Sequence, residues 1–330
     1  MKVQLKKLQA LTHKALQNYG YAEDEVETIK TVLLYAQMRG NNQGIVKLIG
    51  KGIPKPADVG SIEIEKETKL SAVINGHKNH AMVVVNKGTD LAIKKAQEHG
   101  IGLVGINGVN TSSGAIGYYA RKIAQQNLVG FVFAGSPETV APEGSYEALF
   151  GTNPIAIGVP SQNEPLVLDM ATAAMAYYGV IEANTAGQSL PQGIAYDVDG
   201  NLTVDPAKVL ADGALRTFDK GRKGSGLSMM VQILAGPLVG ASFAGFGDIA
   251  NNWSGHLIVA IDPELLNGLD ALRDGVSKIV ERVKSLKKLP NVQEIYVSGE
   301  RGDSQTASVL AVGEIEIEER LYRELEKVAG

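Results

Sequence analysis

Hydrophobic and polar positions follow a helical period at the start of the chain. Leucines recur at helical spacing between residues 3 and 19, and a second helical pattern covers residues 23–38. Gly20 separates the two patterns, and residues 47–60 contain glycines and prolines that break any period. The N-terminus is therefore predicted to be a helical pair that leads into a connecting segment.

Further along, alternating stretches and short apolar runs predict strands. Residues 61–74 alternate between polar and apolar, and buried strands are predicted at residues 102–106, 128–134, 154–159, 166–168 and 257–261. Helices are predicted at residues 83–99, 117–126, 173–184 and 227–238, and the last 65 residues are mostly helical in pattern, with one strand-like segment at 292–297. Because helices and strands do not alternate strictly, the pattern favours an α+β fold or a mixed sheet.

Composition narrows the class of protein. The chain has 330 residues, 38 glycines and a formal charge of −4, so it offers no overall attraction for nucleic acid. It contains no cysteine, which excludes disulfide scaffolds, thiolate nucleophiles and cysteine-based zinc sites. The N-terminal residues lack a continuous apolar core, and no stretch approaches the roughly 20 apolar residues of a membrane span. We expect a cytoplasmic protein that binds small molecules, with neither nucleic acid nor membrane as a partner.

Several familiar motifs are missing. The chain has no G-x-G-x-x-G dinucleotide fingerprint, no G-x-x-x-x-G-K-[ST] phosphate loop and no G-x-S-x-G nucleophile elbow. His77 and His80 are three residues apart, but no third ligand has metalloprotease spacing, so this segment is interpreted as a solvated loop. No metal site is predicted.

Three blocks carry a resemblance over nearly the whole chain. The first contains GAIGYYA at residues 114–120, SPE at 136–138 and APEG at 141–144. The second runs from LFGTNPIAI at 149–157 to VLDMAT at 167–172, and the third joins GRKGSGL at 221–227 to GHL at 255–257 and AIDP at 260–263. Together, in this order and spacing, they resemble the malate/L-lactate dehydrogenase-like family of NAD(P)-dependent oxidoreductases. Ureidoglycolate, sulfolactate and diketogulonate dehydrogenases and a reductase of cyclic imino acids also belong to this family.

The resemblance implies a fold distinct from the Rossmann fold. The fold implied is α+β, with a largely antiparallel central sheet and helical N- and C-terminal segments packed together. Three parts are expected: a helical terminal domain of residues 1–67 plus 266–330, a small α/β segment at 68–118 and a cofactor-binding domain at 119–265. The resemblance also implies a homodimer with its active sites at the subunit interface.

The same blocks supply candidate groups for binding NAD or NADP, with a slight preference for NAD. Positive charge beside backbone N–H groups makes Arg222, Lys223 and Gly224 a candidate anion site ahead of a helix, although they could also be surface cations at a helix start. The resemblance carries over a cofactor role to six further residues: Ser136, Pro137, Thr152, Asn153, Asp169 and Met170. By themselves, the first four are typical of turns, and Asp169 is typical of a helix N-cap.

The family's catalytic positions are altered in this chain. The family motif Asp-Ser-His-Gly-x-x-Arg is matched by residues 41–47, where Gln43 replaces the histidine and Lys47 replaces the arginine. Glutamine cannot exchange a proton near neutral pH, and lysine keeps the charge of arginine but loses its bidentate fork. In a second family motif, Ser-Asn-His-Phe-Gly, Ser112 replaces the histidine most often credited with proton delivery. Both usual proton donors are therefore absent.

Three hypotheses follow from these replacements. The substrate could be a cyclic imine, which as an iminium needs hydride but no delivered proton. The substrate could instead be a small 2-oxo acid, if Lys47, Tyr118, Tyr146 or His80 transfers the proton. Finally, the protein could bind nucleotide without turnover. Gln43, Lys47 and Ser112 are the predicted catalytic positions, and a small carboxylate is the predicted substrate.

Overall fold

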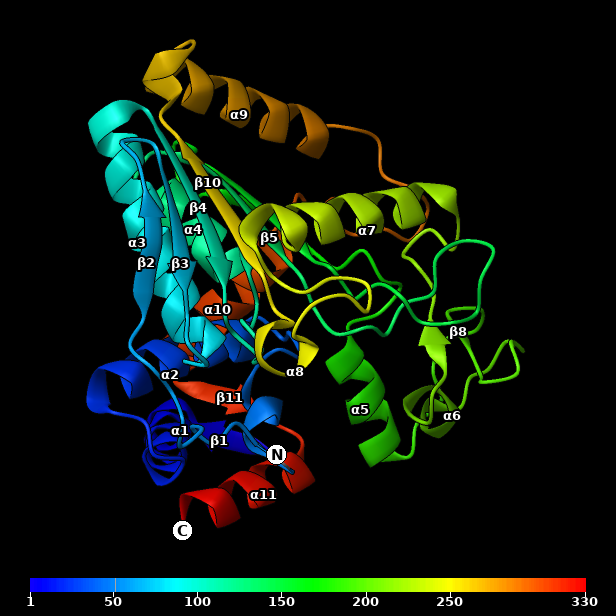
Figure 1. The fold of residues 1–330 in the computed structure, drawn as a ribbon. Coiled ribbons are helices and arrows are strands. Elements are labelled where there is room, and N and C mark those ends of the chain that lie inside the picture. Colours follow the sequence, from blue (N-terminus) through cyan, green and yellow to red (C-terminus); the bar gives the residue numbers. More distant parts are fainter. Residues whose placement is uncertain (51) are drawn as a thin grey trace.

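A central sheet of seven strands organises the structure, a computed structural model that describes residues 1–50 and 52–330 (Figure 1). Across the sheet the strands are β2 (Glu63–Glu67), β3 (Ser71–Asn75), β4 (Ile101–Asn107), β10 (His256–Ile261), β5 (Val129–Ala134), β6 (Ile155–Val159) and β7 (Leu166–Met170). Only β3 and β4 pair in parallel, and every other neighbouring pair is antiparallel. The predicted mixed fold with a largely antiparallel sheet is confirmed.

Two helices cover one face of this sheet, α3 (Ala81–His99) and α4 (Gly117–Gln125). They approach the strands closely because glycine lies at the contact points. A Cβ atom on Gly102 would lie 1.9 Å from the Ala92 carbonyl oxygen of α3, and one on Gly158 would lie 2.2 Å from the Ala120 oxygen of α4. The main hydrophobic core fills the space between these helices and the sheet.

The two ends of the chain pack together at the bottom of Figure 1. There α1 (Leu5–Asn18) packs against α2 (Glu23–Met38) and α11 (Glu319–Ala329), and the short strands β1 (Lys2–Gln4) and β11 (Glu314–Glu316) pair antiparallel. The helical N-terminal pair is confirmed, except that its first helix begins at Leu5. Residues 2–4 form a strand instead, because β11 supplies a partner from the other end of the chain.

The remaining helices and strands lie beside or beyond the sheet. A second hydrophobic core is formed by buried side chains between residues 140 and 215. The helices are α5 (Tyr177–Ala186), α6 (Pro206–Leu210), α7 (Arg222–Leu234), α8 (Ile249–Asn252), α9 (Leu269–Lys284) and α10 (Glu300–Val312). Strands β8 (Ala195–Tyr196) and β9 (Ala214–Leu215) pair with each other. Three 3-10 turns complete the chain, η1 (Ile45–Leu48), η2 (Pro237–Val239) and η3 (Pro263–Leu265).

Two of the predicted elements are wrong in extent and one is wrong in kind. The helix predicted at 173–184 begins only at Tyr177, because Ala173 forms a bridge with Thr217 and Ala174 donates to the Arg216 carbonyl. The helix predicted at 227–238 begins at Arg222 and ends at Leu234. Residues 292–297 form no strand, although all of them are described. One of their backbone donors, the Val297 N–H, is used by the Glu300 carboxylate.

The seven-stranded sheet crosses the boundary expected at residue 118, since β4 lies directly beside β10. The division into three parts stays a prediction. Lys51, in the connecting segment predicted at 47–60, is outside the described residues. Among the described helices, none combines the length and apolar character that crossing a membrane requires.

Candidate active site

Two of the altered family positions meet in space. The Lys47 Nζ atom, on η1, donates to the Ser112 Oγ atom at 2.8 Å, although the two residues are 65 positions apart. The backbone N–H of Gly114 donates to the same Oγ atom at 3.2 Å. The serine oxygen therefore accepts two hydrogen bonds, and its own hydroxyl hydrogen is left to serve another group.

Lys47 is almost completely enclosed, with 2% of its surface exposed. Its Nζ atom lies 3.3 Å from the centroid of the Tyr178 ring, on α5. Burial lowers the pKa of this lysine well below its ordinary value, because an ammonium group loses its hydration there. Among the described residues, Ser112 is the one hydrogen-bonding partner of the Lys47 amine.

His80 caps α3 at the edge of this group, where its Nδ1 atom accepts from the Met82 N–H at 3.2 Å. Only 3% of the residue is exposed, so its interpretation as part of a solvated loop is wrong. Burial, followed by the charge of Lys47, lowers the pKa of His80 to about 3. A ring that stays neutral at physiological pH is a poor proton donor, which argues against His80 in that role.

The two tyrosines considered as proton carriers lie elsewhere. Tyr118, on α4, packs edge-on against the Tyr35 and Tyr119 rings. Tyr146 is 47% exposed on a loop that contacts Gly200. Neither lines the cavities described below, which leaves Lys47 as the best placed of the four candidates.

Ser112 opens onto a cavity of about 630 Å³, called here the central cavity. Its described lining includes five of the residues singled out from the sequence: Gln43, Ser112, Ser136, Pro137 and Thr152. Tyr178 and Trp253 add aromatic surface to the wall. Five predicted site residues thus share one cavity, while its aromatic lining comes from segments that the family blocks do not include.

Hydrogen bonds fix the loop ahead of β6 at one side of this cavity. Ser136 Oγ and Thr152 Oγ1 lie 3.0 Å apart, and the Asn153 N–H donates to Ser136 Oγ at 3.2 Å. Asn153 itself is fully buried, so it supports the cavity wall from behind. Of these three residues, Ser136 and Thr152 can contact a ligand directly.

A second cavity, also about 630 Å³, continues from the first and is called the Asp169 cavity. Gln43, Gly114, Thr152 and Pro154 line both cavities and mark the junction. Asp169 and Met170, at the end of β7, line the second one, as the resemblance implied for a cofactor site.

The Asp169 carboxylate accepts the Gly117 N–H at 2.9 Å, so it caps α4 rather than the helix that follows it in sequence. The surrounding protein raises its pKa to about 6, while the Gly117 donor and the Arg39 charge oppose that rise. The residue is nevertheless exposed to the cavity. A ligand that covers the carboxylate would strengthen its electrostatic interactions, because it would exclude solvent from them.

A third cavity of about 470 Å³ extends from the second and is called the Tyr296 cavity. Arg39, Asn41 and Asp169 line both. The Arg39 guanidinium stacks on the Tyr35 ring, 4.7 Å from its centroid, and is ion-paired with Asp303 at 2.7 Å. Sequence reasoning missed Arg39, although it lies only two residues before the motif at residues 41–47.

The predicted anion site at the start of α7 has a different environment. Asp219 Oδ1 accepts the backbone N–H groups of Gly221 and Gly224, both at 3.0 Å. Although partial desolvation would raise the pKa of Asp219, these donors and Thr217 lower it overall. Arg222 and Lys223 are exposed in the first turn of α7, so they form a helix and not the expected loop. They line none of the three cavities in the part of the chain that the structure describes.

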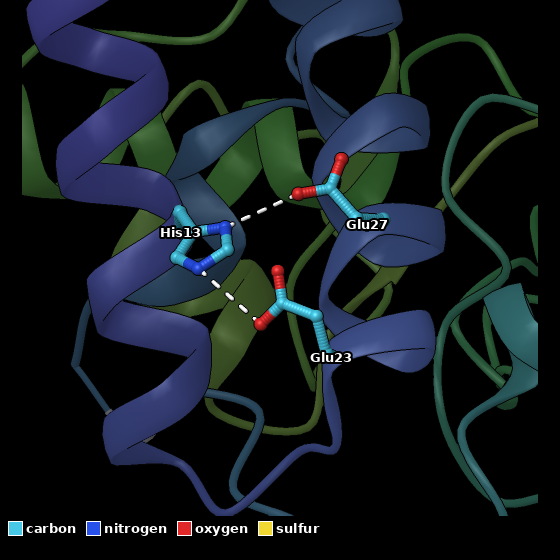
Figure 2. Close-up of side chains that lie close together, drawn as sticks. All are labelled: His13, Glu23 and Glu27. Atoms are coloured by element: carbon cyan, nitrogen blue, oxygen red, sulfur yellow. Dashed lines mark hydrogen bonds and ion pairs between the residues drawn. The ribbon is translucent and has the colours of Figure 1, made fainter.

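Figure 2 shows a group of one histidine and two glutamate side chains between α1 and α2, none of which lines the three cavities. Within residues 1–50 and 52–330 it is the one group with the composition of a metal site. His13 Nδ1 faces Glu27 at 3.2 Å and Nε2 faces Glu23 at 3.5 Å, so the two carboxylates use different ring nitrogens. Lys30 also pairs with Glu27. The arrangement is that of an ion-paired surface histidine.

Comparisons with known proteins identify the family of the chain. The malate/L-lactate dehydrogenase family model matches residues 3–326. Malate/(S)-sulfolactate dehydrogenase of Methanothermus fervidus is 35% identical, covering 97% of this chain and 95% of the relative. The Δ1-pyrroline-2-carboxylate/Δ1-piperideine-2-carboxylate reductase of Pseudomonas putida is 30% identical, covering 94% of this chain and 95% of the relative.

A solved structure, the malate dehydrogenase of Pyrococcus horikoshii, superposes with a TM-score of 0.88 at 30% identity, covering 100% of this chain and 94% of that one. The fold and the site therefore define an oxidoreductase of the dehydrogenase and reductase class. The chain belongs to the malate/L-lactate dehydrogenase family.

Proposed function

We propose that this protein transfers hydride between a nicotinamide cofactor and a small 2-oxo or 2-hydroxy acid. One observation carries the proposal: three cavities adjoin one another, and their shared walls contain Gln43, Thr152 and Asp169. The central cavity ends at the Ser112 hydroxyl and its Lys47 partner, where a reacting carbonyl needs a donor. The two cavities beyond the junction offer room for an extended ligand.

The residues present fit a nicotinamide dinucleotide. Such a cofactor supplies or accepts the hydride, while the protein must hold it beside the substrate carbon. At the junction, the Thr152 and Ser136 hydroxyls would hydrogen-bond the carboxamide, and Met170 would contact the apolar surface of the ligand. Arg39 and Asp169 would bind the polar groups of the adenosine half. This mode of binding dispenses with the Rossmann glycine motif, which the chain lacks.

We favour NAD over NADP because of Asp169. A carboxylate in the cavity wall accepts hydrogen bonds from ribose hydroxyls and repels a 2′-phosphate. The strength of this preference depends on Arg301, an exposed cation that lines the adjoining Tyr296 cavity. Measured affinities for NADH and NADPH would decide the matter.

The proposed activity is tested by following NADH and NADPH absorbance with two substrate panels, small 2-oxo acids and cyclic imino acids. Turnover of a 2-oxo acid is the expected result. Turnover of cyclic imines alone would transfer the assignment to an imino acid reductase, a class that the Pseudomonas putida relative represents. If neither panel is turned over but a nucleotide raises the melting temperature, the protein is a binding module. If no nucleotide stabilises the protein, the cofactor site itself is refuted.

We also propose that the protein acts as a homodimer. The outer side of α7 exposes Met229, Met230 and Ile233, each by more than two fifths, while its inner side is buried against Asn153. Such an apolar stripe favours a second copy of the chain. Arg222 and Lys223 begin the same helix, so a role for them in cofactor binding requires the partner copy. A cytoplasmic location stays a prediction.

A further inference from the structure

We propose that Lys47 and Ser112 form a proton relay that replaces the missing imidazoles, with Ser112 delivering the proton to the substrate and Lys47 supplying it. This inference rests on the proposed reaction with 2-oxo acids and names the groups that complete it. A competing assignment makes Lys47 a simple anchor for the substrate carboxylate, as its charge alone would allow. The geometry of the pair decides between these roles.

Hydrogen bonding around Ser112 directs the relay toward the substrate. The Oγ atom accepts from Lys47 Nζ at 2.8 Å and from the Gly114 N–H at 3.2 Å, which uses both of its acceptor sites. Among the described residues, the hydroxyl hydrogen has no acceptor other than Lys47 itself within hydrogen-bonding distance. Because Ser112 lines the central cavity, a carbonyl oxygen bound there is the natural acceptor for this hydrogen.

The position of Lys47 argues against a direct anchor. Its residue is 2% exposed and lines no part of the central cavity, so Ser112 stands between the amine and a substrate bound there. The Tyr178 ring lies 3.3 Å from Nζ and holds the amine against the serine. A group in this position can pass a proton through Ser112, whereas it cannot form a paired contact with a carboxylate in the central cavity.

A separate cavity gives Lys47 its own access to protons. This Lys47 cavity has a volume of about 610 Å³ and adjoins the central cavity at Gly52, Tyr178 and Ile181. Water in it could restore the lysine proton after each turnover without entering the substrate site. Among the described residues, the titratable and charged groups near Lys47 are His80 at the N-cap of α3, Tyr178 and Glu182 from α5, Glu318 at the N-cap of α11, and Arg320 and Glu324 from α11.

The relay balances the reaction in both directions. In reduction, hydride adds to the carbonyl carbon, and the electron pair of the C=O π bond moves onto oxygen. The Ser112 hydroxyl gives its proton to that oxygen and receives one from the Lys47 ammonium, leaving a 2-hydroxy acid and a neutral amine. In oxidation, the neutral amine takes the proton of the hydroxy acid through Ser112. Burial favours this neutral form in the free protein, and a bound carboxylate favours the ammonium.

Two substitutions test the relay against the anchor. Lys47→Arg keeps the charge, and even restores the family residue, but arginine does not release its proton. Ser112→Ala keeps Lys47 but interrupts proton transfer. For the relay we expect both variants to lower kcat for 2-oxo acid reduction about 100-fold, with a smaller change in KM. Ser242→Ala is the matched control, because its buried hydroxyl has no hydrogen-bonding partner among the described residues and lines none of the cavities named above.

Three further measurements separate proton transfer from a merely structural role. Lys47→Ala should regain activity with added propylamine, and the gain should follow the pKa of the amine used. Wild-type kcat/KM for hydroxy acid oxidation should rise with pH through a lysine titration that Lys47→Arg lacks. In protein without cofactor, carbon-13 NMR of labelled lysines should show one titration well below the others, lost in Lys47→Arg.

The outcomes distinguish the relay from the reaction on which it rests. Wild-type protein that turns over no 2-oxo acid refutes the proposed function, and the relay falls with it. If the wild type is active and Lys47→Arg has the same kcat, the relay is refuted while the proposed function stands. Lys47 would then be an anchor for the substrate. Retention of activity by Ser112→Ala, within threefold, or an ordinary Lys47 titration in the NMR experiment also overturns it.

Discussion

The side-chain amide of Asn153 donates to Gln232 Oε1 at 2.8 Å and thereby ties the segment just before β6 to the last turn of α7. The same nitrogen donates to the Ser228 carbonyl at 3.1 Å. Asn153 is fully buried and has a φ angle of 37°, in the left-handed region that few residues other than glycine and asparagine adopt. One side chain therefore connects the ligand-facing Thr152 to the helix that carries the proposed dimer surface.

Replacing Asn153 with alanine should destabilise the protein by about 2–4 kcal/mol, because two buried acceptors lose their donor and the backbone stays strained. Glycine at this position relieves the strain but not the lost hydrogen bonds, so Asn153→Gly should recover about 1 kcal/mol of that loss. Urea unfolding of both variants measures the two contributions. Equal stability of Asn153→Ala and wild type would show that the amide contacts do not hold the loop.

Introducing a charge on the outer side of α7 should separate the two copies of the proposed dimer. Ile233 is 44% exposed, and Ile233→Arg places a cation where the partner's apolar side chains would lie. We expect the dissociation constant to rise about 100-fold. Sedimentation velocity would then detect the monomer of 34.9 kDa at concentrations where the wild type is dimeric. Val198→Arg, at an exposed residue distant in sequence from α7, is the control. A wild type that is monomeric throughout contradicts the dimer.

The sequence predicted the strands of the sheet well because their apolar runs are continuous. Within two residues, the predicted segments at 102–106, 128–134 and 154–159 coincide with β4, β5 and β6. The hydrophobic pattern could not predict the order of these strands in the sheet. The strand β10 lies between β4 and β5 although it comes from a distant part of the chain. The strand β1 has only three residues, too few for any period to be detected.

The candidate site was predicted in part for a similar reason. Family motifs located Ser112, Gln43 and Thr152, which do line one cavity. The Lys47–Ser112 hydrogen bond spans 65 residues, and Tyr178 reaches Lys47 from a helix that follows another strand, so neither contact could be inferred from spacing. Asp219 is a further example: it accepts backbone N–H groups of Gly221 and Gly224, where α7 begins five residues before the predicted start at residue 227.

Stability should fall in acid because His256 is buried without a hydrogen-bonding partner at either ring nitrogen among the described residues. Burial lowers its pKa to about 3, below the ordinary value of 6.5. The unfolded chain therefore binds a proton between these values that the native protein does not. The contribution of His256 to the free energy of unfolding is complete above pH 6.5. It is lost as the pH falls toward 3, by about 1.4 kcal/mol per pH unit. His80, with a similar pKa, acts in the same direction.

Urea unfolding of wild type between pH 7.5 and 4.5 measures this dependence. In His256→Leu, the pH dependence of the unfolding free energy below pH 6 should decrease by about one proton. His99→Gln, which replaces a more exposed histidine, is the control. Asp169 acts with the opposite sign, since its pKa is raised, but its exposure reduces that effect. Stability that stays constant from pH 7.5 to 4.5 would contradict a neutral buried His256.

Gly117 should be required for cofactor binding rather than for folding. A Cβ atom there would lie 2.7 Å from the Asp169 Oδ2 atom, which accepts the Gly117 N–H. In a helix, alanine is otherwise favoured over glycine by up to about 1 kcal/mol. The steric conflict lowers the free energy of unfolding and the helix preference raises it, so the two effects oppose each other. The carboxylate must nevertheless move away from the cavity. We expect Gly117→Ala to change the melting temperature little and to weaken NADH binding at least tenfold in calorimetry.

Gly275→Ala, in α9 with no atom within 4 Å of the added methyl group, is the matched control and should bind NADH as the wild type does. Unchanged affinity in Gly117→Ala would remove Asp169 from the cofactor site and, with it, the argument for NAD over NADP.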